Sequence, residues 1–242
     1  SLEYFDAVAR DRCNQQPWME DYFEFDRFAA KHVLEIGIGQ GTDLMRFAQA
    51  GAICHGVDIT DNHLALTALN AKLRGKQVDL HKVDATTLPF SDESMDCVYS
   101  FGVLHHIPEV DRVIAEAMRV LRPGGVIMIA LYHQWSAFHL IKWLLFKGLL
   151  AGGLFKLGYA GLLATIEKGS DGRVIKPYVR LYSKAAVREL FCDFIIDDLS
   201  VNQFSLSHIF PSSICGTMAN RELPLASLFG WYVACKARKP KA

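Results

Sequence analysis

Short apolar runs alternate with amphipathic segments over the first half of the chain. The apolar runs span residues 33–36, 52–58, 78–83, 95–100 and 126–132. The segments whose apolar residues recur every three or four positions, as on one face of a helix, span residues 43–50, 62–74 and 110–121. Strands that alternate with helices form parallel sheets covered on both faces. The pattern therefore predicts a doubly wound α/β fold.

An aromatic segment, residues 1–30, precedes the first apolar run. Pro17 divides it, which predicts an N-terminal helical arm in two pieces. Such an arm could pack on the edge of the sheet. It could instead cover a ligand at the carboxyl ends of the strands, with Tyr4, Arg10 or Arg12 reaching that ligand.

Residues 137–166, after the fifth apolar run, are apolar almost throughout, interrupted by lysines and glycines. No uninterrupted run approaches the roughly 18 apolar residues of a spanning helix. Three interpretations remain open: helices of a cap that packs over the core, a cap that binds an apolar ligand, and an interfacial membrane helix with its lysines at the headgroups. The glycines favour short, bent helices. The next stretch, residues 173–182, has basic and aromatic side chains that could anchor an anionic group.

Three glycines at alternate positions, Gly37, Gly39 and Gly41, end the first apolar run. Glycine lets the backbone turn tightly and approach a ligand, and the following helix start presents unpaired N–H groups. Asp58 ends the next run, roughly 20 residues further on, where a carboxylate can accept hydrogen bonds from both ribose hydroxyls. These features indicate a nucleotide-binding unit.

The charge balance argues against a nucleic-acid partner, because 26 basic and 26 acidic residues cancel and no basic stripe is present. The six cysteines are scattered without metal-ligand spacing, so no metal site is predicted. Reduced thiols and the lack of a visible signal peptide are typical of a cytoplasmic protein.

Five motifs between about residues 33 and 132 carry a family resemblance. They read VLEIGIGQGTD, GVDIT, DATTLPF, DCVYSFGVLHHI and LRPGG. Together they resemble class I S-adenosylmethionine-dependent methyltransferases, and are most similar to the small-molecule group that includes the ubiquinone and menaquinone C-methyltransferases. The resemblance implies a Rossmann-like, mostly parallel seven-stranded sheet with an antiparallel last strand. Residues 194–201 and 229–236 can supply the final pair, and the helical cap is inserted after strand five.

The cofactor implied by the resemblance is S-adenosylmethionine, with S-adenosylhomocysteine as product. Glu35 and the glycine turn would hold the methionine moiety, and Asp58 the ribose. Asp84 would frame the adenine, and Phe101 would line the methyl-donor pocket. The full set of implied cofactor residues is Glu35, Gly37, Gly39, Gly41, Asp58, Ile59, Asp84, Ala85, Phe101 and Gly102.

Two histidines, His105 and His106, follow the fourth apolar run on a loop that should face the methyl donor. Imidazole titrates near neutral pH, so His106 is the predicted general base. Alternatively, both histidines only hydrogen-bond the loop, and alignment of the reactants supplies the catalysis. The residues expected near the acceptor are His105, Tyr132, His133 and Arg180.

These expectations describe a single domain with four consecutive parts. The parts are the arm 1–30, the cofactor-binding core 31–132, the helical cap 133–182, and a C-terminal helix and strand pair 183–242. The predicted reaction is methyl transfer to a small or medium-sized, lipophilic organic acceptor at oxygen, nitrogen or carbon. The alternatives are an NAD-dependent oxidoreductase and a non-catalytic nucleoside-binding protein. The turn in this chain lacks the third glycine of the G-x-G-x-x-G pattern that is typical of such oxidoreductases.

Overall fold

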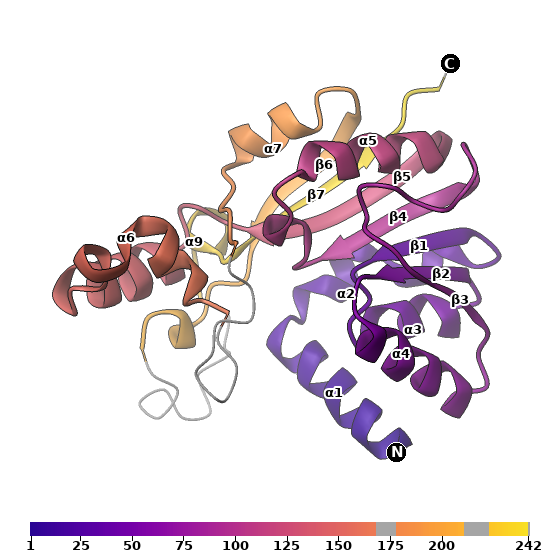
Figure 1. Cartoon of the computed structure of the whole chain (residues 1–242), viewed down its shortest axis with the longest axis horizontal. Coiled ribbons are helices and arrows are strands. Elements are labelled where there is room, and N and C mark those ends of the chain that lie inside the picture. The colour runs from indigo at the N-terminus through magenta and orange to yellow at the C-terminus, as the bar shows by residue number, and fades with distance from the viewer. Residues whose placement is uncertain (168–177, 211–222, 242) are drawn as a thin grey trace.

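The computed structural model describes residues 1–167, 178–210 and 223–241, and Figure 1 shows their arrangement. The strands are β1 (His32–Ile36), β2 (Ile53–Asp58), β3 (Val78–Lys82), β4 (Met95–Phe101), β5 (Leu121–Tyr132), β6 (Ile195–Asn202) and β7 (Tyr232–Arg238). The helices are α1 (Leu2–Gln15), α2 (Trp18–Phe23), η1 (Phe25–Phe28), α3 (Thr42–Gln49), α4 (Asp61–Leu73), η2 (Leu104–His106), α5 (Val110–Val120), η3 (Phe138–Leu150), α6 (Gly153–Ala164), α7 (Lys184–Leu190), η4 (Leu206–His208) and α9 (Ala226–Phe229).

All seven strands form one sheet in the order β3-β2-β1-β4-β5-β7-β6. Neighbouring strands run parallel from β3 to β5, whereas β7 runs antiparallel to both β5 and β6. The predicted Rossmann-like sheet with an antiparallel last strand is therefore confirmed. The order reverses at β1, so the crevice between β1 and β4 is where such a sheet binds its ligand.

Helices cover both faces of the sheet (Figure 1). On one face, Val113 of α5 and Val187 of α7 join a buried apolar cluster. On the other, Phe23 of α2, Phe47 of α3 and Ala71 of α4 join a second cluster. Burial on both faces explains why the central strands read as continuous apolar runs instead of alternating with polar residues.

Two strands, β5 and β7, begin more than one residue away from the position predicted from the sequence. β5 begins at Leu121, which pairs with Met95, and the register shifts before Cys97 pairs with Val126. This irregularity accommodates Pro123, which cannot donate to a ladder. β7 begins only at Tyr232, because residues 226–229 form the short helix α9.

The region after β5 forms two short helices, as the glycines predicted. η3 is a π-helix, and α6 is bent at Gly158, whose φ of 69° is not helical. The indole N–H of Trp143 in η3 donates to Thr165 Oγ1 at 3.1 Å and ties the two helices together. Residues 168–177, part of the expected cap and of the basic aromatic stretch, lie outside the described residues. No described helix is both long and apolar enough to cross a membrane.

Candidate functional site

A cavity of about 900 Å³ opens at the carboxyl ends of β1, β2 and β4. Most of the residues predicted to hold the cofactor line it: Glu35, Gly37, Gly39, Asp58, Ile59, Asp84, Ala85 and Phe101. The structure thus gathers side chains from four separate sequence motifs around one space. Gly41 and Gly102 are not among the lining residues.

The glycine turn has a steric requirement at both ends. Gly37 has a φ of +80°, and a Cβ there would lie 2.4 Å from Cγ2 of Val103. Gly41 has a φ of +73°, and its Cβ would lie 2.7 Å from Cγ2 of Thr67 in α4. The Thr67 hydroxyl donates to the carbonyl of Gly39 at 3.2 Å. Gly41 therefore shapes the turn from behind instead of lining the cavity.

Asp58 is held in a fixed orientation at the end of β2. Its Oδ1 accepts the backbone N–H of Thr60 at 2.9 Å, and its Oδ2 accepts the N–H of Gly39 at 3.4 Å. Nδ1 of His63 lies 3.0 Å from the same Oδ2. His63 also lines the cavity, although its sequence position gave no reason to select it. A carboxylate oriented in this way can accept the hydroxyls of a ribose.

Arg12 of α1 reaches from the N-terminal arm to the cavity wall. Its Nη2 is 2.6 Å from Oδ2 of Asp43, which also accepts the Tyr99 hydroxyl at 2.9 Å. The guanidinium carbon lies 4.0 Å from the centre of the Phe101 ring. Burial, with the neighbouring Asp43 charge, raises the pKa of the Glu35 carboxyl well above its usual range. The arm thus brings a positive charge to a buried acidic group at the cavity.

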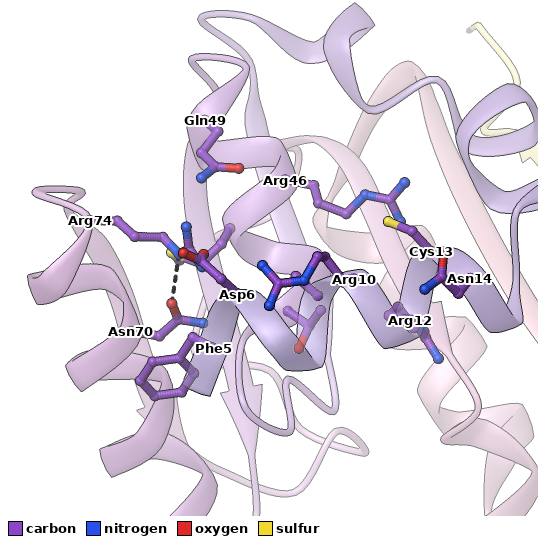
Figure 2. A pocket seen from close by; sticks show the side chains of 13 residues that line it. Phe5, Asp6, Arg10, Arg12, Cys13, Asn14, Arg46, Gln49, Asn70 and Arg74 are labelled. Carbon is purple, nitrogen blue, oxygen red and sulfur yellow. Dashed lines mark hydrogen bonds and ion pairs between the residues drawn. The ribbon is translucent and has the colours of Figure 1, made fainter. Parts of the chain in front are cut away.

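The other two arm residues considered from the sequence, Tyr4 and Arg10, do not line this cavity, although Tyr4 contacts the lining residue Gln40. The Tyr4 hydroxyl donates to Gln40 at 2.7 Å. Arg10 lines a neighbouring cavity of about 420 Å³ between α1, α3 and α4 (Figure 2). In that cavity Arg74 pairs with Asp6 at 2.6 Å, and Arg46 pairs with Glu20. These ion pairs fasten the arm to the core.

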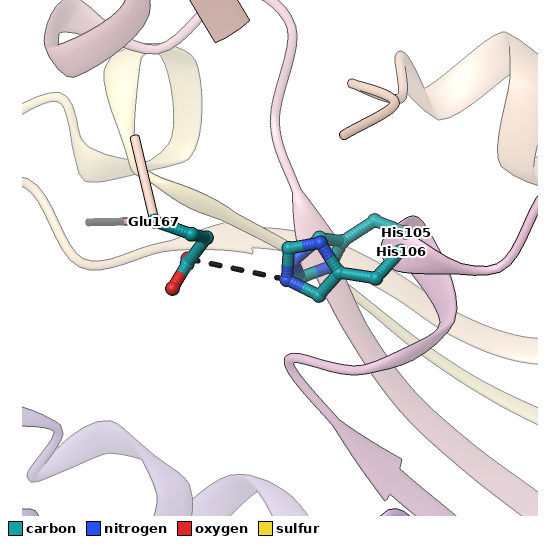
Figure 3. Close-up of side chains that lie close together, drawn as sticks. All are labelled: His105, His106 and Glu167. Carbon is teal, nitrogen blue, oxygen red and sulfur yellow. Dashed lines mark ion pairs between the residues drawn. The ribbon is translucent and has the colours of Figure 1, made fainter. Parts of the chain in front are cut away.

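His106 lines the larger cavity, and the carboxylate of Glu167, which follows α6, lies beside it (Figure 3). Its Nδ1 lies 2.9 Å from the carbonyl oxygen of Tyr178, which can only accept, so we assign the Nδ1 proton to this bond. In the neutral ring Nε2 then keeps its lone pair. Oε1 of Glu167 lies 3.9 Å from this Nε2 and accepts the buried Tyr132 hydroxyl in a short hydrogen bond.

The remaining residues expected near the acceptor do not line this cavity. His105 is fully buried and stacks on the Tyr132 ring, 3.7 Å between centroids. His133 is also buried and its Nδ1 lies 3.1 Å from the carbonyl of Gly230, while burial lowers its pKa. The backbone N–H of Arg180 donates to the carbonyl of His105. These residues support the loop of His106 from behind.

A possible metal site, which the sequence did not predict, arises from the same loop. His105, His106 and Glu167 offer ligand atoms that all lie within 4.8 Å of one another. Two imidazoles and a carboxylate are ligands that divalent transition metals accept. The separation of His106 Nε2 and Glu167 Oε1 would have to shorten for both to bind one ion.

Comparison with known proteins identifies the core. Residues 34–129 match a family model described as a methyltransferase domain. The methyltransferase GfsG of Streptomyces halstedii is 33% identical over 127 residues, 51% of this chain and 44% of that protein. A ubiquinone biosynthesis O-methyltransferase of Rhizobium etli is 29% identical over 121 residues, 46% of this chain and 49% of that protein. The chain thus spans about half the length of these relatives.

Solved structures resemble the chain over most of its length. A SAM-dependent methyltransferase from Methanosarcina mazei aligns with a TM-score of 0.64 and 19% identity, covering 88% of this chain and 93% of that one. The [4+2]-cyclase SpnF aligns with a TM-score of 0.60 and 20% identity, covering 98% of this chain and 81% of that one. At such identities the likeness shows the fold alone, and the cyclase shows that this fold also carries other reactions.

Proposed function

We propose that this chain, whose residues 34–129 are a class I S-adenosylmethionine-dependent methyltransferase domain, transfers the cofactor's methyl group to a small or medium-sized, lipophilic acceptor. The domain match agrees with the resemblance predicted from the five sequence motifs. The acceptor is the finer part of this proposal, because the matched region covers the cofactor half of the molecule.

The observation that carries the proposal is the cavity at the carboxyl ends of the parallel strands. Its volume of about 900 Å³ and its oriented Asp58 carboxylate fit a nucleoside cofactor. Gly37 leaves the turn without a side chain where a Cβ would meet Val103. Asp58 would accept the ribose hydroxyls, while Asp84 and Ala85 would frame the adenine. When bound, the cofactor supplies a sulfonium-activated methyl group.

On the acceptor side, His106 would take a proton from an acceptor hydroxyl or amine through Nε2. The Nδ1–H bond to the Tyr178 carbonyl orients the ring for this role. The nearby Glu167 carboxylate would stabilise the imidazolium that forms. His106 Nε2 would hold the proton that the acceptor gives up, and the bound cofactor would supply the methyl group that takes its place. Alignment alone would suffice for an acceptor that is already deprotonated.

Calorimetry followed by a transfer assay tests this function. The protein should bind S-adenosylhomocysteine, and it should transfer radiolabelled methyl from S-adenosylmethionine to members of a panel of hydroxylated, lipid-like acceptors. Binding without transfer to any acceptor would favour the nucleoside-binding alternative. Tight NADH binding in place of S-adenosylhomocysteine binding would favour the oxidoreductase. The ubiquinone O-methyltransferase among the relatives makes hydroxylated quinones the first acceptors to include.

A further inference from the structure

The η3–α6 hairpin, residues 138–164, exposes many large apolar side chains for its length. Their exposed fractions lie between 42% and 83%, and the residues are Leu145, Phe146, Leu149, Leu150, Phe155, Leu157 and Tyr159. Single exposed apolar residues are ordinary, whereas a concentration of them on one element indicates a contact site. We call these seven residues the apolar hairpin face.

The two helices of the hairpin pack closely against each other, so the exposure of the seven residues does not result from loose packing. Trp143, Leu162 and Leu163 are buried. Gly148 lets the helices approach closely, since a Cβ there would lie 3.0 Å from Leu162 Cδ2. The Trp143 indole N–H donates to Thr165 Oγ1 at 3.1 Å. The two helices therefore form a supported unit that presents its other side outward, at one end of the molecule's long axis (Figure 1).

The charged residues within the hairpin segment itself have one sign. Residues 137–166 contain Lys142, Lys147 and Lys156 and no acidic residue, although the whole chain has equal numbers of acidic and basic residues. Lys147 and Lys156 are exposed, and each directly follows an exposed phenylalanine in the sequence. The Lys147 ammonium lies 3.7 Å from the centre of the Trp143 ring. Apolar side chains flanked by lysines match the interface of an anionic lipid bilayer, where the apolar groups enter the acyl boundary and the ammonium groups meet the phosphates.

We propose that the η3–α6 hairpin docks this protein on the surface of an anionic membrane. The contact is interfacial, because neither helix is long and apolar enough to span a bilayer. The hairpin also leads directly to the acceptor end of the site: α6 ends at Ala164, and Glu167 follows beside His106. If the proposed methyl transfer holds, docking would therefore place the acceptor side of the cavity close to lipophilic molecules in the membrane. Docking itself requires no catalysis.

Vesicle flotation with the full chain tests the proposal. The protein should float with vesicles of phosphatidylcholine and phosphatidylglycerol, and about tenfold less with phosphatidylcholine alone. The double substitution Leu150→Ser/Phe155→Ser should reduce flotation by about tenfold or more, because binding scales with inserted apolar area. The charge reversal Lys147→Glu/Lys156→Glu should remove the preference for the anionic lipid and its dependence on salt.

Matched controls separate this surface from general hydrophobicity and charge. Leu69 and Leu73 of α4 are 44% and 41% exposed on another part of the molecule. Leu69→Ser/Leu73→Ser should leave flotation unchanged, and so should Lys72→Glu/Lys241→Glu. The hairpin variants should bind S-adenosylhomocysteine like the wild type, which keeps a failure of docking distinct from a failure of the proposed function.

Three results would overturn the proposal: no flotation with anionic vesicles, equal loss of flotation in the α4 control, or a concentration-dependent dimer that only the Leu150→Ser/Phe155→Ser variant abolishes. The last would make the face an interface between copies of this chain. The Phe155→Trp variant measures directly whether this position enters the bilayer. Brominated lipid should quench the fluorescence of the added tryptophan, which is the difference between the variant and the wild type. Absence of added quenching would also contradict insertion.

Discussion

Glu167 Oε1 lies 3.9 Å from Nε2 of His106, which joins the end of the helical hairpin to the loop after β4. The same Glu167 oxygen accepts the hydroxyl of Tyr132, at the end of β5. A carboxylate fixed in this way beside Nε2 of a histidine stabilises the protonated ring and orients it. This relationship makes Glu167 a positioning residue for the proposed base.

Replacing Glu167 with Gln removes the charge and keeps the shape. We expect kcat to fall by about tenfold, and His106→Ala to lower it by about 100-fold, in line with general base catalysis. KM for S-adenosylmethionine should stay unchanged in both variants, because neither side chain is assigned to the cofactor. The exposed Glu189→Gln on α7 is the control. Native kcat in His106→Ala would leave alignment as the source of catalysis.

The Asp58 assignment is tested by cofactor affinity. Asp58→Ala removes charge-assisted hydrogen bonds to the ribose, each worth about 1.5–3 kcal/mol, so affinity for S-adenosylhomocysteine should fall by about tenfold or more. Isothermal titration calorimetry measures this directly, and circular dichroism checks that the fold is retained. Unchanged affinity would mean that the ribose lies elsewhere.

Arg12 should matter for stability as well as for binding. Arg12→Ala leaves Asp43 buried without its 2.6 Å partner, and removal of one member of a buried pair typically costs about 3–5 kcal/mol. Arg12 is partly exposed, so we expect about 2–3 kcal/mol after solvent screening. Urea unfolding gives the value. Arg10→Ala, on the same helix, should cost well under 1 kcal/mol. Equal losses in both variants would contradict a specific role for the Arg12–Asp43 pair.

Acid should weaken the contact between α5 and the segment before β4. The Glu116 carboxylate accepts hydrogen bonds from the Arg119 side chain and from the Leu88 backbone N–H. These two bonds lower the pKa of the Glu116 carboxyl. A lowered pKa contributes stability that is present above the unfolded value, about 4.3, and is lost as pH falls through the folded value. The Tm of the wild type should therefore be higher than the Tm of Glu116→Gln at pH 7. This difference in Tm should shrink below about pH 4. A difference that is constant with pH would exclude this linkage.

A chelator distinguishes the two uses of the histidine loop. If His106 Nε2 accepts a proton, dialysis against EDTA should leave methyl transfer unchanged. Loss of transfer that added Zn²⁺ restores would instead mean that His105, His106 and Glu167 hold an ion. His81→Ala, in the separate His55–Asp79–His81 group, is the control for metal binding elsewhere.

The parallel core, and the cavity at the carboxyl ends of its strands, could be predicted from the sequence alone. The reason is topological: in a parallel sheet every strand delivers its carboxyl end to the same edge. A residue at or just after the end of each apolar run is therefore expected to meet the others at that edge. Four such residues line the cavity: Gly37, Asp58, Asp84 and Phe101. The positions of the apolar runs and of the residues that end them were enough for this prediction.

Other features depended on contacts that no local pattern records. Arg12 meets Asp43, and Glu167 meets His106, across segments whose relative placement follows only from packing of the whole chain. His133 and Arg180 follow the expected strand or loop, yet neither lines the cavity. Sequence position gives the edge of the sheet at which a residue lies, but not the direction of its side chain.

The hairpin after β5 shows the same limit for a surface. Apolar residues occupy nearly every side of η3 and α6, so hydrophobic periodicity cannot distinguish an inner from an outer face. The folded chain buries Trp143 and Leu162 and leaves Leu150 and Phe155 exposed, which the sequence pattern did not indicate. The physical reason is that burial depends on which neighbours arrive, and those neighbours are fixed by the packing of the two helices against each other.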